Sequence, residues 1–266
     1  MKIFKNILLI FFLILFGCEN EELLTVEIPY DEVLVVQAEL VSGALFPGVR
    51  ITKTLPLGVE FSIEGAEVKE ALLYLRLNGI KIIPLHYTYS GLYKPLNDFT
   101  VTAGDTYELF GERNAQSFYA KTKIPFIPEV LSSNYNFVEG FVGANVKTNS
   151  EEVYAALWII NTSTQQTAED FFNISIPDDI SPAALVYVRS SNISEEYRSP
   201  AYNDKRYIQV YAFDPSYADY YNTKATGQNI NNPYTQGSGL TTWNLQGEKT
   251  IGMFIGAAKS TLLKVN

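Results

Sequence analysis

The residue type best suited to covalent chemistry occurs once in this chain, at Cys18. It lies directly after an unbroken apolar run, Ile7–Phe16, which is itself preceded by Lys2 and Lys5. Two cations ahead of a short apolar run are typical of a secretory signal. The run is too short to cross a bilayer as a helix, which takes about 20 apolar residues. Because the chain has no second cysteine, a disulfide within it is excluded.

The residues around Cys18 indicate which modification to expect. The sequence Leu15-Phe16-Gly17-Cys18 resembles the bacterial lipobox, in which leucine, a variable residue and a small residue precede an acylated cysteine. We therefore predict that residues 1–17 are a lipoprotein signal peptide and that Cys18 carries diacylglycerol and a fatty acid such as palmitate. Several acyl chains anchor a protein firmly, since each buried CH₂ contributes about 0.8 kcal/mol. The alternative is a structural cysteine beside an ordinary cleavage site.

Residues 18–29 are predicted to form an acidic tether. Glu19, Glu21 and Glu22 follow the cysteine, and acids in this place resemble the surface-export signal of some Gram-negative outer-membrane lipoproteins. The alternative is a solvated leash whose charges contact nothing. We expect a lipid-anchored protein of the outer membrane, and we favour the cell surface over the periplasmic side.

Composition narrows the class of protein further. Removal of residues 1–17 takes away two lysines and no acid, so the formal net charge moves from −9 to −11. An acidic chain is not expected to bind nucleic acid, because that binding depends on Lys and Arg. The chain contains 18 Tyr and 16 Phe, residues that favour strands, so we predict an all-β fold.

Residues for catalysis are scarce. His86 is the only histidine, so a typical zinc site and a Ser-His-Asp triad are both disfavoured, and we interpret His86 as a partly exposed strand residue. Asp178 and Asp179 lack the alternating acidic loop of a calcium site and indicate a loop turn instead. A pair of carboxylates for glycoside hydrolysis cannot be identified from spacing, because their separation is set in space. We assign no catalytic, cofactor-binding or metal-binding residue.

The elements that would position a site are mostly short strands. Two apolar runs flank Asn78-Gly79, which favours a type I′ turn, so we predict a hairpin from about Leu72 to Leu85. Short strands at close spacing predict an Ig-like β-sandwich over residues 30–125. Pro125 and Pro128 interrupt the pattern, so we place a domain boundary there.

Residues 126–266 are predicted to form a second β-rich domain with one short helix. The segment "KRYIQVYAFD" is apolar on both faces and predicts a central strand. In "DPSYADYYNTKA", Asp214 can cap a helix and Pro215 suits its first position. Three tyrosines then share one face: Tyr217, Tyr220 and Tyr221. They form either an aromatic binding platform or, in the interpretation we favour, rings that fix the helix on the sheet.

Several longer segments resemble a family of uncharacterised outer-membrane lipoproteins. They are "VLVVQAELV", "GAEVKEALLYLRLNG" followed by "SGLYK", "VTAGDTYELF", "YAKTKIP", "IQVYAFDPSYADYY" and "NNPYTQGSGLTTWNLQGEKTIGMFIG". Asn244 and Gly247 are a loose match to the family's usual ending. Members are often encoded beside TonB-dependent transporters, which implies a role in nutrient uptake or surface assembly, and the family supplies no catalytic residue.

Three functions therefore remain open from the sequence. The first is a binding or accessory module beside a TonB-dependent transporter, with a glycan or peptide as its ligand. The second is a surface hydrolase that degrades glycans or peptides with a carboxylate pair. The third is a structural component of the cell surface.

Overall fold

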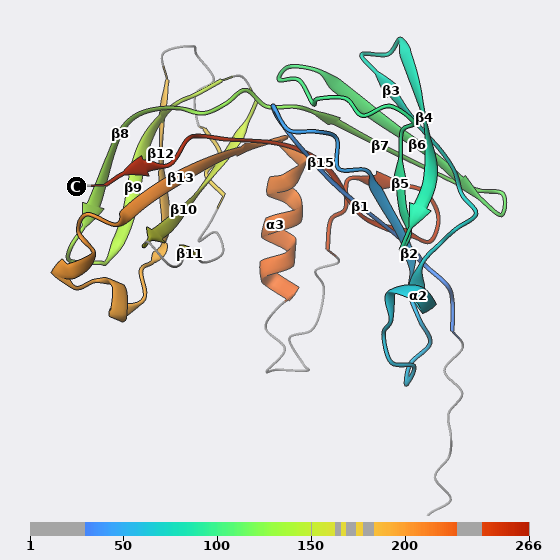
Figure 1. Ribbon diagram of the computed structural model, residues 1–266, viewed down its shortest axis with the longest axis horizontal. Coiled ribbons are helices and arrows are strands. Elements are labelled where there is room, and N and C mark those ends of the chain that lie inside the picture. Colours follow the sequence, from blue (N-terminus) through green and yellow to red (C-terminus); the bar gives the residue numbers. More distant parts are fainter. Residues whose placement is uncertain are drawn as a thin grey trace, which may run out of the picture. The chain divides into compact units, whose positions relative to one another are not determined.

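A computed structural model describes most of the chain (Figure 1), namely residues 30–149, 151–162, 166–168, 174–177, 184–227 and 241–265. Strands account for 53% and helices for 9% of the structure, so the predicted all-β class is confirmed. The chain divides into two units, Met1–Asp31 and Glu32–Asn266, and every element named below belongs to the second. Within the described ranges, no helix is both long enough and apolar enough to cross a membrane.

The N-terminal part of this unit is a succession of antiparallel strands and one short helix. The elements are β1 (Leu34–Val41), β2 (Val49–Lys53), α2 (Ile63–Ala66), β3 (Leu72–Leu77), β4 (Lys81–Tyr89), β5 (Leu92–Lys94), β6 (Thr106–Arg113) and β7 (Gln116–Lys123).

The predicted hairpin is confirmed as β3 and β4. Asn78 and Gly79 have φ values of 51° and 72°, as both central residues of a type I′ turn require. The N–H of Ile80 donates to the carbonyl of Leu77 at 3.0 Å and closes the turn. The dipeptide therefore sets the register in which Leu73 lies opposite Leu85.

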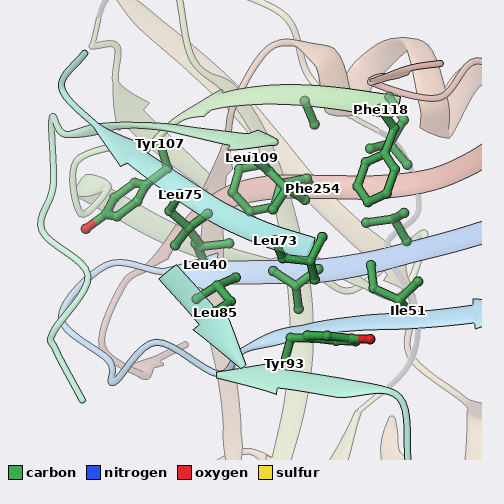
Figure 2. Packing of buried hydrophobic residues seen from close by; sticks show 14 of the residues in the cluster. Leu40, Ile51, Leu73, Leu75, Leu85, Tyr93, Tyr107, Leu109, Phe118 and Phe254 are labelled. Atoms are coloured by element: carbon green, nitrogen blue, oxygen red, sulfur yellow. The ribbon is translucent and has the colours of Figure 1, made fainter. Parts of the chain in front are cut away.

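These strands enclose a hydrophobic cluster that we call the first core. Strands β1, β2 and β5 lie on one side of it and β3, β6 and β7 on the other, while β4 pairs with β3 through Leu85 and with β5 from His86 onwards. Figure 2 shows the buried side chains, among them Leu40, Leu75 and Leu109. The Ig-like topology that we predicted for this region stays a prediction.

The C-terminal part contains a second set of strands. They are β8 (Glu129–Asn136), β9 (Phe141–Lys147), β10 (Val153–Asn161), β11 (Gln166–Ala168), β12 (Leu185–Asn192), β13 (Arg206–Phe213), β14 (Leu245–Gln246), β15 (Thr250–Lys259) and β16 (Leu263–Lys264). Two 3₁₀ turns, Glu195–Tyr197 and Pro200–Tyr202, and the helix α3 (Ser216–Gly227) complete it.

A second core forms between the three-stranded sheet β12-β9-β8 and strands β10 and β13, with Trp158 fully buried in it. The prediction that β13 is a central strand is confirmed, because β10 pairs with one edge of β13 while β15 and β16 pair with the other. Ile208 and Val210 of β13 are fully buried.

The two parts share β15. This strand pairs in parallel with β1, so that Leu34 lies beside Thr250 and Val41 beside Ala257. Phe254 of β15 is a member of the first core (Figure 2), and Leu245 of β14 belongs to the same cluster. The domain boundaries predicted at 30–125 and 126–266 stay a prediction, and these contacts show that the first core includes residues from near the end of the chain.

Candidate ligand-binding groove

The residues singled out for covalent modification and export are Cys18, Glu19, Glu21 and Glu22, and all four lie outside the described residues. Lipidation and surface export therefore stay predictions. Asp178 and Asp179 also lie outside the described residues. In the part of the chain that the structure describes, no group of three or more His, Cys, Asp or Glu residues is placed to hold a metal ion.

The predicted helix is present as α3, and two of its tyrosines pack against aromatic rings outside the helix. Asp214 caps it, since its Oδ1 accepts hydrogen bonds from the N–H of Ser216 at 3.1 Å and from the hydroxyl of Ser216 at 2.6 Å. The Tyr217 ring stacks on Phe213 of β13 with centroids 4.2 Å apart, and Tyr220 packs against Trp243 at 5.3 Å. These contacts support the interpretation that the rings fix the helix to the sheet.

One carboxyl group near the predicted boundary is buried. The desolvation of Glu152 raises its pKa, and the N–H of Phe126 and the hydroxyl of Tyr154 partly offset this shift by donating hydrogen bonds of 2.8 and 3.0 Å to its two oxygens. The hollow beside it has a volume of about 100 Å³, well below the 300–1,000 Å³ typical of ligand pockets. Glu152 therefore holds the chain at Phe126 in place, and its oxygens are already engaged.

A larger hollow lies beside β4. Its volume is about 300 Å³, and it is lined by Lys81–Pro84 and His86 on one side and Pro95–Phe99 on the other. This volume reaches the lower end of the range for ligand sites. His86 is an exposed residue of β4, as the sequence interpretation had it, and it lies within the lining.

The base of this groove is fixed by the first core. Ile83 and Phe99 are partly buried against that core. Phe99 is stacked between two buried rings, Phe46 at 5.0 Å and Tyr107 at 6.1 Å. These rings therefore hold Phe99 in place at the base of the groove.

The rims of the groove combine apolar and polar side chains. Ile82 and Leu96 are large apolar residues that face solvent on opposite sides of it. The polar lining residues are Lys81, His86, Asn97 and Asp98. An apolar surface with a few polar groups of both charges is the usual composition of a binding site for an organic ligand.

The backbone of β4 is also part of the groove. Lys81–Leu85 pair with β3 on one side, while pairing with β5 on the other side begins only at His86. The other side of this half-strand borders the hollow. Pro84 interrupts it, because proline has no N–H to donate.

The neighbouring sheet face carries a row of rings and a paired charge. Tyr74 stacks on Phe110 with centroids 4.8 Å apart and planes 9° apart, which is the spacing of adjacent strands. The rings therefore stand across the strands and stabilise the sheet. Arg76 donates to both Glu108 oxygens at 2.7 and 2.8 Å, and these bonds lower the pKa of Glu108 to about 2.

Sequence reasoning identified His86 but missed the groove. The available signal was "IKIIPL", in which Ile82 and Ile83 are adjacent. Adjacent residues of a strand face opposite sides, so one isoleucine had to lie on the outer face. That exposed isoleucine is Ile82.

Comparison with known proteins adds no assignment, because no protein-family model matches the chain and no curated protein is significantly similar to it. The resemblance to outer-membrane lipoproteins therefore stays a proposal.

Proposed function

We propose that this protein is an outer-membrane lipoprotein that serves as a binding or accessory module beside a TonB-dependent transporter. The observation that carries the binding role is the groove between Lys81–Pro84 and Pro95–Phe99. The lipid anchor rests on the lipobox-like sequence that ends at Cys18, and the transporter rests on the family resemblance.

An extended peptide segment of a partner protein suits this groove best. A peptide laid along Lys81–Leu85 could pair with the side of β4 that has no ladder to β5, which is how many domains capture extended segments. The apolar rims Ile82 and Leu96 would then receive alternate side chains of the peptide. Such a surface suits an accessory module that recognises a loop or terminus of its neighbour. A glycan is the alternative ligand.

Co-purification tests this proposal. The tagged lipoprotein is extracted from its own outer membrane in several mild detergents, and its companions are identified by mass spectrometry. We compare the wild type with Leu96→Asp, which puts a charge on the groove rim, and with Val138→Asp, a similarly exposed position in the β8–β9 turn.

We expect the wild type and Val138→Asp to recover a TonB-dependent transporter and Leu96→Asp to lose most of it. Failure of the wild type to recover a transporter in any detergent would contradict the accessory role. Equal recovery by both variants would contradict the assignment to the groove. Mass analysis of Cys18 in the same samples reports the anchor separately, because an unacylated cysteine contradicts the lipoprotein assignment alone.

The two alternative functions have weaker support among the described residues. A carboxylate-pair hydrolase needs two acids with different protonation states, whereas Glu152 uses both oxygens to bind the chain. A structural fibre needs a long, regular edge strand, whereas the side of β4 that has no ladder to β5 covers only Lys81–Leu85, and a bulge between Val130 and Ser132 interrupts β8.

A further inference from the structure

The segment between β2 and α2 exposes large apolar side chains at alternate positions. Leu57 is 81% exposed, Val59 54% and Phe61 69%. Isolated exposed apolar residues are ordinary on protein surfaces, but three of them within five residues of one loop make a candidate contact surface. We call residues 55–62 the apolar loop.

Local hydrogen bonds give the apolar loop a defined shape. The N–H of Val59 donates to the carbonyl of Pro56 at 3.2 Å, and Gly58 between them has a φ of 85°, as in a tight turn. At the other end, the hydroxyl of Ser62 accepts from the N–H of Gly65 at 3.1 Å and caps α2. The loop and α2 project beyond the end of β2 (Figure 1).

The base of this projection coincides with the place where the chain joins the second unit. Val33 and Thr54 exchange hydrogen bonds: the N–H of Thr54 donates to the Val33 carbonyl at 2.9 Å, and the N–H of Val33 donates to the Thr54 hydroxyl at 3.1 Å. Glu32 also forms an ion pair with Lys53 at 3.3 Å. The apolar loop therefore begins one residue after the point that holds the incoming chain.

The chain length limits how far this base can lie from the anchor. Glu32 is fourteen residues after Cys18 (32 − 18), which spans at most about 50 Å when fully extended. Acyl chains on Cys18 would keep the loop at a high local concentration next to the bilayer, so that even weak contacts between loop and lipid would form.

We propose that the apolar loop inserts into the surface of the bilayer that holds the acyl chains of Cys18, an inference that rests on the lipid anchor proposed above. We choose lipid as the partner of the apolar loop for two reasons. The chain that leads back to Cys18 enters the fold beside the loop, and a bilayer accepts apolar side chains without specific partners. Glu60 and Glu64 are exposed and give the projection negative charge, so acidic headgroups do not attract it and the attraction to the bilayer must come from its apolar side chains. Tyr89 at the end of β4 is also exposed. It lies two residues before Gly91, whose N–H donates to Glu67 at the α2 end of the projection. Tyrosine is common at membrane interfaces.

A fluorescent probe on the lipidated, full chain tests the insertion. Phe61→Cys provides a thiol for an environment-sensitive dye, since Cys18 is acylated in this material. The labelled protein is reconstituted into phosphatidylethanolamine–phosphatidylglycerol vesicles with and without a doxyl-labelled lipid that quenches embedded dyes. The matched control is Ile80→Cys, because Ile80 is 86% exposed but lies in the β3–β4 turn. The nine residues of β4 put it about 30 Å from the end of that strand nearest the loop.

We expect the dye at position 61 to be quenched like a lipid-linked dye, at any salt concentration, and the dye at position 80 to behave as it does in water. Equal, weak quenching at both positions in vesicle-bound protein would overturn the insertion. The same holds if position 61 becomes shielded only when a partner protein is added, since the loop would then be a protein contact. Protein that does not float with the vesicles at all, with either dye, would instead indicate failure of the lipid anchor.

Discussion

Replacement of Asn244 by alanine is expected to loosen β15 from the first core. The Asn244 side chain accepts from the N–H of Phe254 at 2.9 Å and donates to the carbonyl of Phe254 at 2.6 Å. Phe254 is completely buried, and its strand partner on the β1 side is Ala38. The pairing of β15 with β13 covers only Ala257–Lys259, so Asn244 takes the place of a neighbouring strand at Phe254.

The size of the effect follows from the groups that lose their partners. A buried backbone group that is left without a hydrogen bond costs about 1–3 kcal/mol. Asn244 is itself half-buried, so water can reach the site partly, and the lower part of that range applies to each group. We expect a loss of about 2–3 kcal/mol, or a fall in Tm of roughly 4–12 °C for a chain of this size.

Thermal unfolding of the purified protein, followed by circular dichroism, measures this loss. Thr242→Ala is the matched control, because Thr242 is exposed and its hydrogen bond to the hydroxyl of Thr223 is donated by the backbone N–H, which alanine keeps. The reasoning fails if Asn244→Ala melts within about 1 °C of Thr242→Ala, a difference that corresponds to less than 0.5 kcal/mol.

Two further substitutions test the ion pair on the neighbouring sheet face and the pairing of β1 with β15. The pKa of Glu108 lies at about 2, below its ordinary value of 4.5, so its pairing with Arg76 stabilises the fold above pH 4.5, and this stabilisation is lost as the pH falls towards 2. We expect Glu108→Gln to remove about 1 kcal/mol of this acid-sensitive stability. The measurement is Tm against pH, and unchanged acid sensitivity would contradict the assignment. Gly252 has a φ of 124°, and a Cβ there would lie 1.9 Å from the carbonyl oxygen of Val36. Gly252→Ala should therefore lower the free energy of unfolding by more than about 3 kcal/mol, seen as loss of folded protein. A wild-type melting curve would show instead that the β1–β15 pairing can adjust.

The features that could be predicted from the sequence are those set by neighbouring residues. Asn78-Gly79 alone specifies the turn between β3 and β4. Asp214 and Pro215 directly precede α3 and predict where it starts. In each case the signal and the structure lie within a few residues, so chain order carries the information.

The features that escaped prediction depend on residues that are distant in the chain. Asp214 caps α3, as expected, but its Oδ2 also accepts from the N–H of Lys123 at 2.8 Å, a contact that no local pattern indicates. The groove depends on Phe99, whose position is set by Phe46 and Tyr107. The residues proposed for anchoring and export lie outside the described part of the chain, and their assignment comes from the sequence.

The parallel pairing of β1 with β15 has a consequence for the order in which the protein matures. Synthesis from the amino end makes β1 early, whereas its partner Thr250–Lys259 is made much later. Until then, one edge of β1 and the place of Phe254 in the first core stay open, and such unpaired edges are prone to aggregate. Completion of the first core must therefore wait until β15 has been synthesised, so a chaperone that shields the incomplete sheet until then would raise the yield of folded protein.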